Sequence, residues 1–320
     1  MTEPVRWGLL STARINSAIL EGARPSERTE VVAVASRDQA RADAYARDRG
    51  LERAYGSYEA LLEDDEIEVV YNSLPNSLHV DWSIRALDAG KHVLCEKPLD
   101  RRVEAVERAF DAAERNGRLL MEAFMYRHHP QTRKAAELVR DGAVGELRQL
   151  RSLFSFMLTD NADVRMLPEL DGGALMDLGC YCLSMQRLLA GEPELVFGRQ
   201  RLGGGGVDVA FVAVLQFPGA VLGEFHCGFD LPEGTGLEAM GSDGKLVVPD
   251  PVRCRDPHVE LNGKRIDVED VDRYFVQVEN FSAAVRGEAE PLLGRADALG
   301  QVRAIEALYR SAVSGAAEPL

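Results

Sequence analysis

The sequence has few cysteines and no arrangement that would use them structurally. Its five cysteines are odd in number and include no C-x-x-C pair, so neither a disulfide framework nor a zinc ribbon is indicated. We interpret them as small buried apolar side chains. The six histidines lack the spacing of metal ligands, and we therefore expect no metal site.

Long apolar runs are also missing. No stretch approaches the roughly 20 apolar residues of a membrane-spanning helix, and the N-terminal residues show no basic segment followed by an apolar one. The sequence therefore predicts a cytoplasmic protein without a membrane partner. At 320 residues, of which 46% are hydrophobic and 28% charged, the chain is long enough for two globular domains, each with its own core.

Positive charge is in deficit. The chain carries 37 lysines and arginines against 52 aspartates and glutamates, which gives a formal charge of -15. Binding to nucleic acid normally depends on a basic surface, so we expect no nucleic-acid partner. An anionic cofactor is not excluded, because at physiological salt charges act over about 8 Å and a few local arginines outweigh distant carboxylates.

Up to residue 123, short apolar runs alternate with amphipathic stretches. Strands are expected over residues 5–10, 30–36, 67–73, 92–96 and 118–122, and helices over 15–22, 38–50, 57–63, 77–90 and 103–117. This alternation indicates a parallel sheet covered by helices on both faces, that is, a doubly wound α/β fold. We predict a dinucleotide-binding Rossmann domain over residues 1–123.

After residue 123 the alternation stops. Strands are expected over residues 147–156, 194–200, 207–217, 220–229, 235–240, 245–248 and 259–268, and helices over 131–141, 173–189, 271–286 and 295–314. Consecutive strands joined by glycine-bearing turns indicate an open, mostly antiparallel sheet. We predict an α+β domain over residues 124–320, with a site in the cleft between the two domains.

The first strand–helix turn lacks the glycines of a nucleotide-binding loop. Where G-x-G-x-x-G is expected, this chain has Ser11, Ala13 and Asn16. Glycines there let the backbone approach a pyrophosphate, but the donors are backbone N–H groups at a helix N-terminus, which need no particular side chain. By itself the turn does not decide between a nucleotide site and an ordinary connection. The candidate cofactor contacts in it are Gly8, Ser11, Thr12, Ala13, Arg14 and Ile15.

The end of the second strand indicates which cofactor would bind. An NAD-binding domain places a carboxylate there, on the ribose hydroxyls, whereas this chain has Ser36 and Arg37. A hydroxyl and a guanidinium can hydrogen-bond a 2′-phosphate, which a carboxylate would repel. We therefore predict NADP as the cofactor. Asp38, one residue further on, keeps NAD as the alternative.

Five segments form a pattern with a distinctive order and spacing. They are SYEALL (57–62), LPNSLH (74–79), GKHVLCEKPL (90–99), EAFMYRHHPQ (122–131) and DGGALMDLGCYCL (171–183). Together they resemble the glucose-fructose oxidoreductase, inositol dehydrogenase and MocA-like (Gfo/Idh/MocA) oxidoreductase family. Tyr181 stands where many members have histidine. With tyrosine at this position, the chain resembles the subgroup of dimeric dihydrodiol dehydrogenases and xylose dehydrogenases.

The resemblance implies an activity and a set of roles. Members transfer hydride between NAD(P) and a carbon of a sugar, cyclitol or diol, and many form homodimers or homotetramers through the C-terminal sheet. Lys97 matches the lysine at the reacting carbon, and Lys97–Pro98 is a candidate cis peptide. Asp177 and Tyr181 match the motif D-x-G-x-[HY]. The remaining cofactor contacts implied are Leu74, Asn76, His79, Glu96 and Lys97. For His79, packing at a helix start is the alternative.

The residues support the same chemistry directly. Oxidising an alcohol needs a base for the hydroxyl proton, and a tyrosine, with an ordinary pKa of about 10, becomes a better base beside an ammonium group. We predict Tyr181 as the acid/base and Lys97 as its partner. Asp177, the third predicted catalytic residue and also a predicted substrate contact, lies four residues before Tyr181, on the same face of a helix. It can orient the substrate hydroxyls or hold Lys97 charged. Phe156 and Arg165 are the remaining predicted substrate contacts.

Two other functions stay open at this point. An NAD-dependent glycosidase of the same family would use hydride transfer to cleave a glycosidic bond. A non-catalytic regulator would bind the cofactor without turning it over. The presence of both Lys97 and Tyr181 argues against the regulator.

Overall fold

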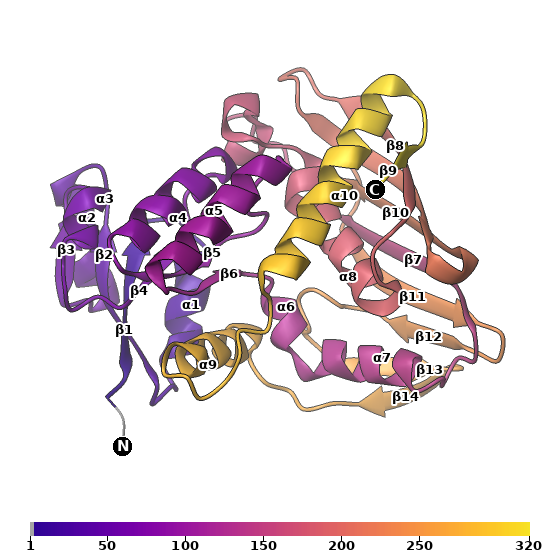
Figure 1. Ribbon diagram of the computed structural model, residues 1–320, viewed down its shortest axis with the longest axis horizontal. Coiled ribbons are helices and arrows are strands. Elements are labelled where there is room, and N and C mark those ends of the chain that lie inside the picture. The colour runs from indigo at the N-terminus through magenta and orange to yellow at the C-terminus, as the bar shows by residue number, and fades with distance from the viewer. Residues whose placement is uncertain (1–2) are drawn as a thin grey trace. The chain divides into compact units, whose positions relative to one another are not determined.

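The computed structural model describes residues 3–320, which form two compact units (Figure 1). The Rossmann unit comprises the chain up to Asp100, Glu104–His128 and Asp272–Ala298. The sheet unit comprises Arg101–Val103, His129–Val271 and Leu299–Leu320. The sequence predicted one boundary, at residue 123. It did not predict that Asp272–Ala298 belongs to the Rossmann unit. No helix among the described residues is long and apolar enough to cross a membrane.

The Rossmann unit is built on a six-stranded parallel sheet in the order β3-β2-β1-β4-β5-β6. Its strands are β1 (Val5–Leu10), β2 (Thr29–Ala35), β3 (Arg53–Tyr55), β4 (Val69–Asn72), β5 (His92–Cys95) and β6 (Leu120–Glu122). The strand order reverses between β1 and β4, the position at which doubly wound sheets bind ligands. The predicted parallel sheet is confirmed, and only the short strand β3 was not predicted.

Helices connect these strands. They are α1 (Asn16–Ala23), α2 (Gln39–Arg49), α3 (Tyr58–Leu62), α4 (His79–Asp88) and α5 (Val103–Asn116), followed by the unpredicted α6 (Met125–His128). Asp38 and Ser57 begin α2 and α3 as N-caps, each accepting a hydrogen bond from a backbone N–H three residues on. Helices α4 and α5 lie together over the β4–β5 side of the sheet (Figure 1).

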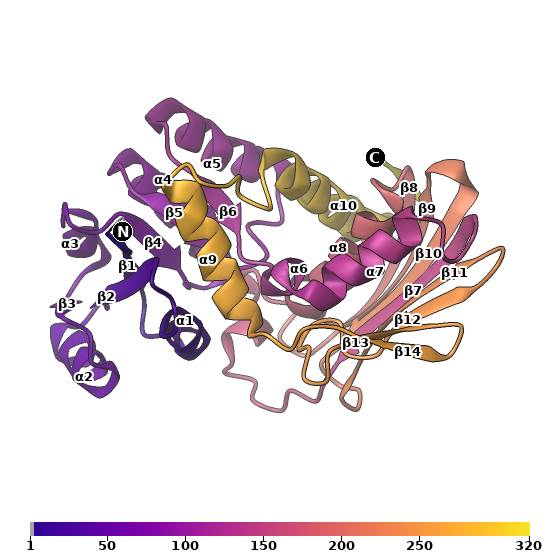
Figure 2. The same cartoon turned by 90° about the horizontal axis from the view of Figure 1, so that it is seen from below.

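Helix α9 (Arg273–Val285) joins the Rossmann unit late in the chain and packs on α1 (Figure 2). The indole N–H of Trp7 in β1 donates to Ser282 Oγ at 3.1 Å, and the Trp7 ring meets Phe281 edge to face at 5.8 Å. The approach to α1 is close at Gly22, where an added Cβ would lie 2.8 Å from the Tyr274 backbone. Nothing in the amphipathic pattern of α9 says which unit it covers.

The sheet unit holds nine strands in the order β14-β13-β12-β11-β7-β10-β9-β8-β15. They are β7 (Leu147–Ser155), β8 (Leu195–Leu202), β9 (Asp208–Phe217), β10 (Val221–Gly228), β11 (Gly234–Gly241), β12 (Lys245–Val248), β13 (His258–Leu261), β14 (Lys264–Asp267) and β15 (Glu318–Pro319). Every pair is antiparallel except β7 with β10. The predicted single strand 259–268 is the hairpin β13–β14, because Asn262 and Gly263 adopt positive φ.

Helices α7 (Pro130–Arg140), α8 (Cys180–Ala190) and α10 (Arg295–Ser314) complete this unit. The opposite face of β9 and β10 stays open, with Val212, Val214 and Leu222 between 48% and 54% exposed. The predicted helix 173–189 differs at its start, because Leu175–Gly179 is a π-helical turn. All five cysteines are buried and free, as predicted.

Replacing Gly22 with alanine tests the packing of α9 on α1. The added methyl group has no room beside the Tyr274 backbone, so we expect the free energy of unfolding to fall by about 1–3 kcal/mol, the usual cost of overpacking. Urea unfolding followed by the fluorescence of Trp7 and Trp82, both in this unit, measures it. Gly294→Ala is the control, because its methyl group would meet nothing within 4 Å. Equal stability of both variants would contradict the close approach.

Candidate active site

The turn after β1 is held by side chains in place of the missing glycines. Ser11 has a φ of 126°, a conformation that normally favours glycine. Its Oγ accepts a hydrogen bond from the Ala13 N–H at 3.1 Å and lies 2.9 Å from Ser73 Oγ. The fully buried Asn16 donates to the Ser11 carbonyl at 2.8 Å and accepts from Ser73 Oγ at 2.7 Å. A polar network therefore fixes the turn that glycines would otherwise allow.

The other predicted cofactor residues of this segment occupy different environments. Gly8 lies inside β1, where an added Cβ would come within 3.0 Å of Leu61 and 3.1 Å of Ile67. Its small size is therefore explained by packing in the unit. Thr12, Arg14 and Ile15 lie in the turn between β1 and α1.

The end of β2 gathers positive charge. Ser36 is buried and donates its N–H to the Tyr55 carbonyl at 2.9 Å. Burial raises the pKa of Tyr58, and the positive charges of Arg37 and Arg41 oppose that rise, so both guanidinium groups lie within electrostatic reach of its hydroxyl. Sequence reasoning missed Arg41 and Tyr58, although Tyr58 lies in the quoted segment SYEALL.

Asp38 has a structural task at the same strand end. Its carboxylate accepts a hydrogen bond from the Arg41 N–H at 2.7 Å and so caps the N-terminus of α2. This capping contact explains an aspartate at this position without a ribose ligand. The observation weakens the alternative that Asp38 signals NAD.

The loops after β4 and β5 are joined through His79. Its ring is 1% exposed, with Nδ1 2.8 Å from the Pro98 carbonyl and Nε2 2.7 Å from the Leu74 carbonyl. Burial lowers the pKa of His79, and its contacts with the two carbonyl groups oppose that lowering. The ring therefore packs between two loops, which explains a histidine at the start of α4 without requiring a ligand. Asn76 opens the adjoining 3₁₀ turn Asn76–Leu78.

Glu96 and Lys97 follow β5 directly, and the Lys97–Pro98 peptide is cis, as the motif indicated. The hydroxyl of Tyr71 in β4 donates to Glu96 Oε1. Burial raises the pKa of Tyr274 to about 12, with Glu96 adding to the rise and Lys97 opposing it. Tyr274 therefore lies near both residues. Sequence reasoning missed it, because α9 was not expected in this unit.

In the sheet unit, the predicted substrate residues come together. Phe154 meets Tyr181 edge to face at 5.7 Å and Phe156 at 6.3 Å. The Arg165 guanidinium lies 5.4 Å from the Phe156 ring and pairs with Asp177 at 3.5 Å. Tyr181, Phe156, Arg165 and Asp177 thus form one cluster of aromatic and charged groups. Phe154 was not predicted as a member.

Arg165 is held firmly in this cluster. Its Nε and Nη2 both donate to Asp163 at 2.8 Å, a bidentate geometry. The bonds to Asp163, with the charge of Asp177 adding to them, raise the pKa of Arg165 above its ordinary value. Asp177 therefore faces a permanent positive charge from within its own unit.

Asp177 and Tyr181 do not share one regular α-helix. Asp177 lies in the π-helical turn Leu175–Gly179, and Tyr181 lies in the first turn of α8. The expectation of an i, i+4 pair on one α-helical face is therefore corrected. Both residues belong to the aromatic cluster instead, because Asp177 pairs with Arg165 and Tyr181 packs on Phe154. Such π-helical turns occur often at functional sites.

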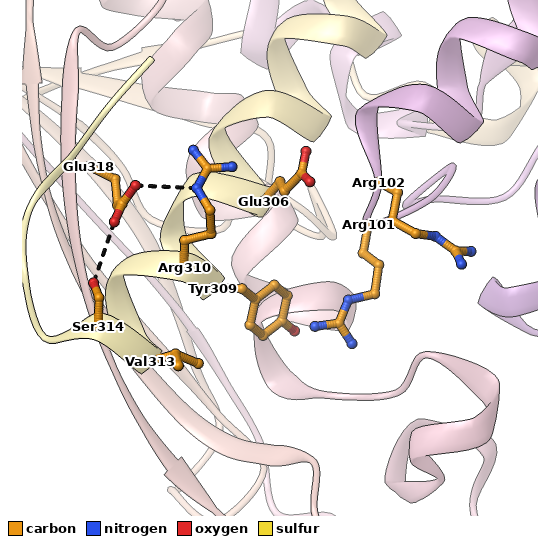
Figure 3. A pocket seen from close by; sticks show the side chains of 8 residues that line it. All are labelled: Arg101, Arg102, Glu306, Tyr309, Arg310, Val313, Ser314 and Glu318. Atoms are coloured by element: carbon orange, nitrogen blue, oxygen red, sulfur yellow. Dashed lines mark hydrogen bonds and ion pairs between the residues drawn. The ribbon is translucent and has the colours of Figure 1, made fainter.

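A separate pocket of about 510 Å³ opens elsewhere on the sheet unit (Figure 3). None of the predicted site residues lines it. Its walls are Arg101, Arg102, Glu306, Tyr309, Arg310, Val313, Ser314 and Glu318. Within residues 3–320 no group of three or more histidine, cysteine or carboxylate side chains is placed to hold a metal ion.

Comparison with family models shows which protein family the chain belongs to. The family model described as "Oxidoreductase family, NAD-binding Rossmann fold" matches residues 6–124, and the GFO/IDH/MocA C-terminal domain matches residues 132–247. The chain belongs to the GFO/IDH/MocA oxidoreductase family. The family predicted from the sequence motifs is thereby confirmed.

Individual relatives match most of the chain. D-xylose 1-dehydrogenase (NADP(+)) 2 of Haloferax volcanii is 40% identical over 98% of this chain and 99% of that protein. Trans-1,2-dihydrobenzene-1,2-diol dehydrogenase of Danio rerio is 33% identical, covering 84% and 87% of the two chains.

A solved relative gives the same result for the fold. A 3-ketoreductase from Actinomadura kijaniata, in complex with NADP and TDP-benzene, superimposes with a TM-score of 0.90 at 32% identity, covering 96% of this chain and 98% of that one. The same ketoreductase has been solved with a lysine replaced by alanine or glutamate, and with a tyrosine replaced by phenylalanine.

Replacing Asn16 with alanine tests the network in the glycine-free turn. The change leaves Ser73 and the Ser11 carbonyl short of a buried partner, so we expect the free energy of unfolding to fall by about 1–3 kcal/mol. Chemical denaturation measures it. Ser17→Ala, the next residue of α1, leaves these bonds intact and serves as the control. An Asn16 variant as stable as this control would mean that the network does not hold the turn.

Proposed function

We propose that this member of the GFO/IDH/MocA family is an NADP-dependent oxidoreductase that interconverts alcohol and carbonyl at one carbon of a sugar or diol. The observation that carries this function is the pair Lys97 and Tyr181. They are separated by the same number of residues as the lysine and the tyrosine replaced in the 3-ketoreductase variants. The named activities of the xylose and dihydrobenzenediol dehydrogenases support a sugar or diol substrate.

The residues at the end of β2 fit NADP. Arg37 and Arg41 lie within electrostatic reach of the Tyr58 hydroxyl and supply two guanidinium groups for a 2′-phosphate. Ser36 contributes a hydroxyl at the strand end, and Asp38 is engaged in capping α2. Glu96, Lys97 and the turn Ser11–Ile15 complete the proposed cofactor contacts. When bound, the nicotinamide supplies or accepts the hydride.

Tyr181 is the proposed acid/base. In the oxidation direction its phenolate takes the proton of the substrate hydroxyl, and in the reduction direction its phenol returns a proton to the carbonyl oxygen. The Lys97 ammonium stabilises the phenolate and hydrogen-bonds the substrate oxygen as negative charge develops on it. Neither group works alone in this scheme, because the base strength of tyrosine depends on the nearby cation.

Asp177, Arg165 and Phe156 are the proposed substrate contacts. A carboxylate accepts hydroxyl hydrogen bonds, and the Arg165 guanidinium at 3.5 Å keeps Asp177 oriented. Phe156 offers an apolar ring for the carbon face of a sugar or cyclic diol. This combination suits a ligand with hydroxyls on one side and C–H groups on the other.

The open face of β9 and β10 is proposed to pair with a second copy. Val212, Val214 and Leu222 expose apolar surface there, and the Arg151–Glu224 ion pair at 2.5 Å lies on the same face. Exposed apolar patches of this kind mark association surfaces. A homodimer or homotetramer through this sheet, in the cytoplasm, remains our prediction.

Lys97→Ala and Tyr181→Phe test the catalytic pair. We expect each to lower kcat by about 10²- to 10⁴-fold, the contribution of a positioned acid/base group, while NADP affinity changes only a few-fold. A fluorimetric NADPH assay over aldoses, inositols and trans-diols measures turnover, and protein fluorescence quenching measures cofactor binding. Turnover that survives both substitutions would refute the assigned roles.

Arg37→Ala and Arg41→Ala test the cofactor choice. Each removes a charged hydrogen-bond donor worth about 1.5–3 kcal/mol, so KM for NADP should rise about ten- to hundredfold. KM for NAD should stay the same, because NAD has no 2′-phosphate. Arg47→Ala, an exposed arginine further along α2, is the matched control. An equal rise of KM for both cofactors would count against a 2′-phosphate site.

A further inference from the structure

A buried carboxylate lies at the start of β9, outside the residues assigned so far. Asp208 is 3% exposed. Its Oδ2 accepts a hydrogen bond from the Leu175 N–H at 2.7 Å, and its Oδ1 accepts one from the Tyr309 hydroxyl at 3.0 Å. A carboxylate is costly to bury unless it is hydrogen-bonded, and here both oxygens are used.

The hydrogen bond from Leu175 lies at the start of the π-helical turn. Leu175 is the first residue of the π-helical turn that contains Asp177 and leads into Tyr181. The preceding carbonyl, that of Ala174, accepts a hydrogen bond from Cys227 Sγ at 3.4 Å. The peptide unit between Ala174 and Leu175 is therefore held at both of its polar atoms.

The local sequence is adapted to this carboxylate. Gly173 has a φ of 131°, and an added Cβ would lie 2.2 Å from Asp208 Oδ1 and 3.2 Å from the Tyr309 hydroxyl. Only glycine lets the chain pass so close over the carboxylate. The Gly173 carbonyl in turn accepts from the Asp177 N–H at 3.0 Å. The glycine of the D-G-G motif thus serves the bond between Asp208 and Leu175.

The outer side of Asp208 is closed by Tyr309 of α10. The Tyr309 ring packs edge to face on Phe211 at 5.9 Å. The Arg101 guanidinium lies 4.4 Å from the centre of the same ring, and Figure 3 shows these two side chains next to each other. Arg101 also pairs with Asp171 at 3.6 Å, two residues before Gly173. Burial raises the pKa of Asp208 to about 6, although the hydrogen bonds from Leu175 and Tyr309 lower it. The titratable groups that face it are Tyr309, Arg101 and the Cys227 thiol.

We propose that Asp208 is a positioning residue, which through the Leu175 N–H fixes the π-helical turn and so holds Asp177 and Tyr181 in their working geometry. This inference rests on the proposed function for its catalytic consequence. Its structural part, the anchoring of residues 174–181, stands independently. Hydrogen bonding carries the role rather than charge, because the Tyr309 hydroxyl can either donate or accept.

The substitutions Asp208→Ala and Asp208→Asn separate these possibilities. Alanine removes both bonds, whereas asparagine keeps an acceptor for Leu175 and a donor for the Tyr309 oxygen. We expect Asp208→Ala to lower kcat about ten- to hundredfold, the cost of a misplaced catalytic group, with NADP affinity within twofold of the parent. Asp208→Asn should keep kcat within about threefold, with an unchanged pH profile between pH 5 and 8.

Hydrogen–deuterium exchange supplies a readout that needs no substrate. Amides of residues 174–181 should exchange at least about tenfold faster in Asp208→Ala and at the parent rate in Asp208→Asn. Tyr309→Phe, which keeps the ring but removes the hydroxyl, should fall between them. Asp256→Ala, an exposed carboxylate of the same unit that pairs with Arg265, is the control and should change neither exchange nor turnover.

The outcomes are distinct. If Asp208→Asn loses kcat or gains exchange as Asp208→Ala does, the charge rather than the hydrogen bonds matters, and the positioning role is wrong. Unchanged exchange at residues 174–181 in Asp208→Ala overturns the anchor itself. If Asp208→Ala does not fold, unchanged exchange in Tyr309→Phe overturns it. Faster exchange in Asp208→Ala, together with a parent protein that oxidises no sugar or diol, would leave the anchor standing while the proposed function fails.

Discussion

A buried polar side chain must find hydrogen-bond partners, and in this protein the backbone of the strand-end loops supplies them. Asn16 holds the turn after β1, His79 joins the loops after β4 and β5, and Asp208 holds the turn before α8. All three are nearly or fully buried, so water cannot replace a lost bond. The loops that carry the candidate chemistry are therefore fixed from inside each unit, by side chains that need not touch a ligand.

This constraint explains how a nucleotide-type turn works without its glycines. Glycine permits a backbone conformation at the expense of entropy lost on folding. Here Ser11 adopts that conformation while its hydroxyl bonds Ala13 and Ser73, and Asn16 bonds the Ser11 carbonyl. The hydrogen bonds offset the strain that a Cβ brings at positive φ. Side-chain hydrogen bonds therefore hold this turn where glycines would otherwise allow it. The backbone N–H groups still lie at the start of α1.

The sequence could predict what continuous apolar runs and motif spacing encode. Five of the six strands of the Rossmann sheet were predicted because they are mostly buried, whereas the short strand β3 is only half-buried and was not. Motif and segment led to the predictions of Asp177, Tyr181, Phe156 and Arg165, which lie in one cluster. Contacts between distant parts of the chain were not predictable. Helix α9 joins the Rossmann unit through Trp7 and Ser282, and no local pattern announces that. Tyr274 was missed for the same reason, and the π-helical turn because its partner Asp208 lies in a later strand.

The aromatic walls around Tyr181 strengthen the charges near it. Phe154 packs on Tyr181 and Phe156 lies under Arg165, so part of the water around these groups is replaced by aromatic rings; in bulk water a charge pair at 4 Å is worth only about 1 kcal/mol. The Arg165–Asp177 pair at 3.5 Å lies beside these rings and is only partly exposed, so water screens it less than it would screen a pair on the open surface. The net charge of -15 has little influence there. Local cations placed against aromatic rings, such as Arg165 on Phe156, therefore set the electrostatics of this cluster.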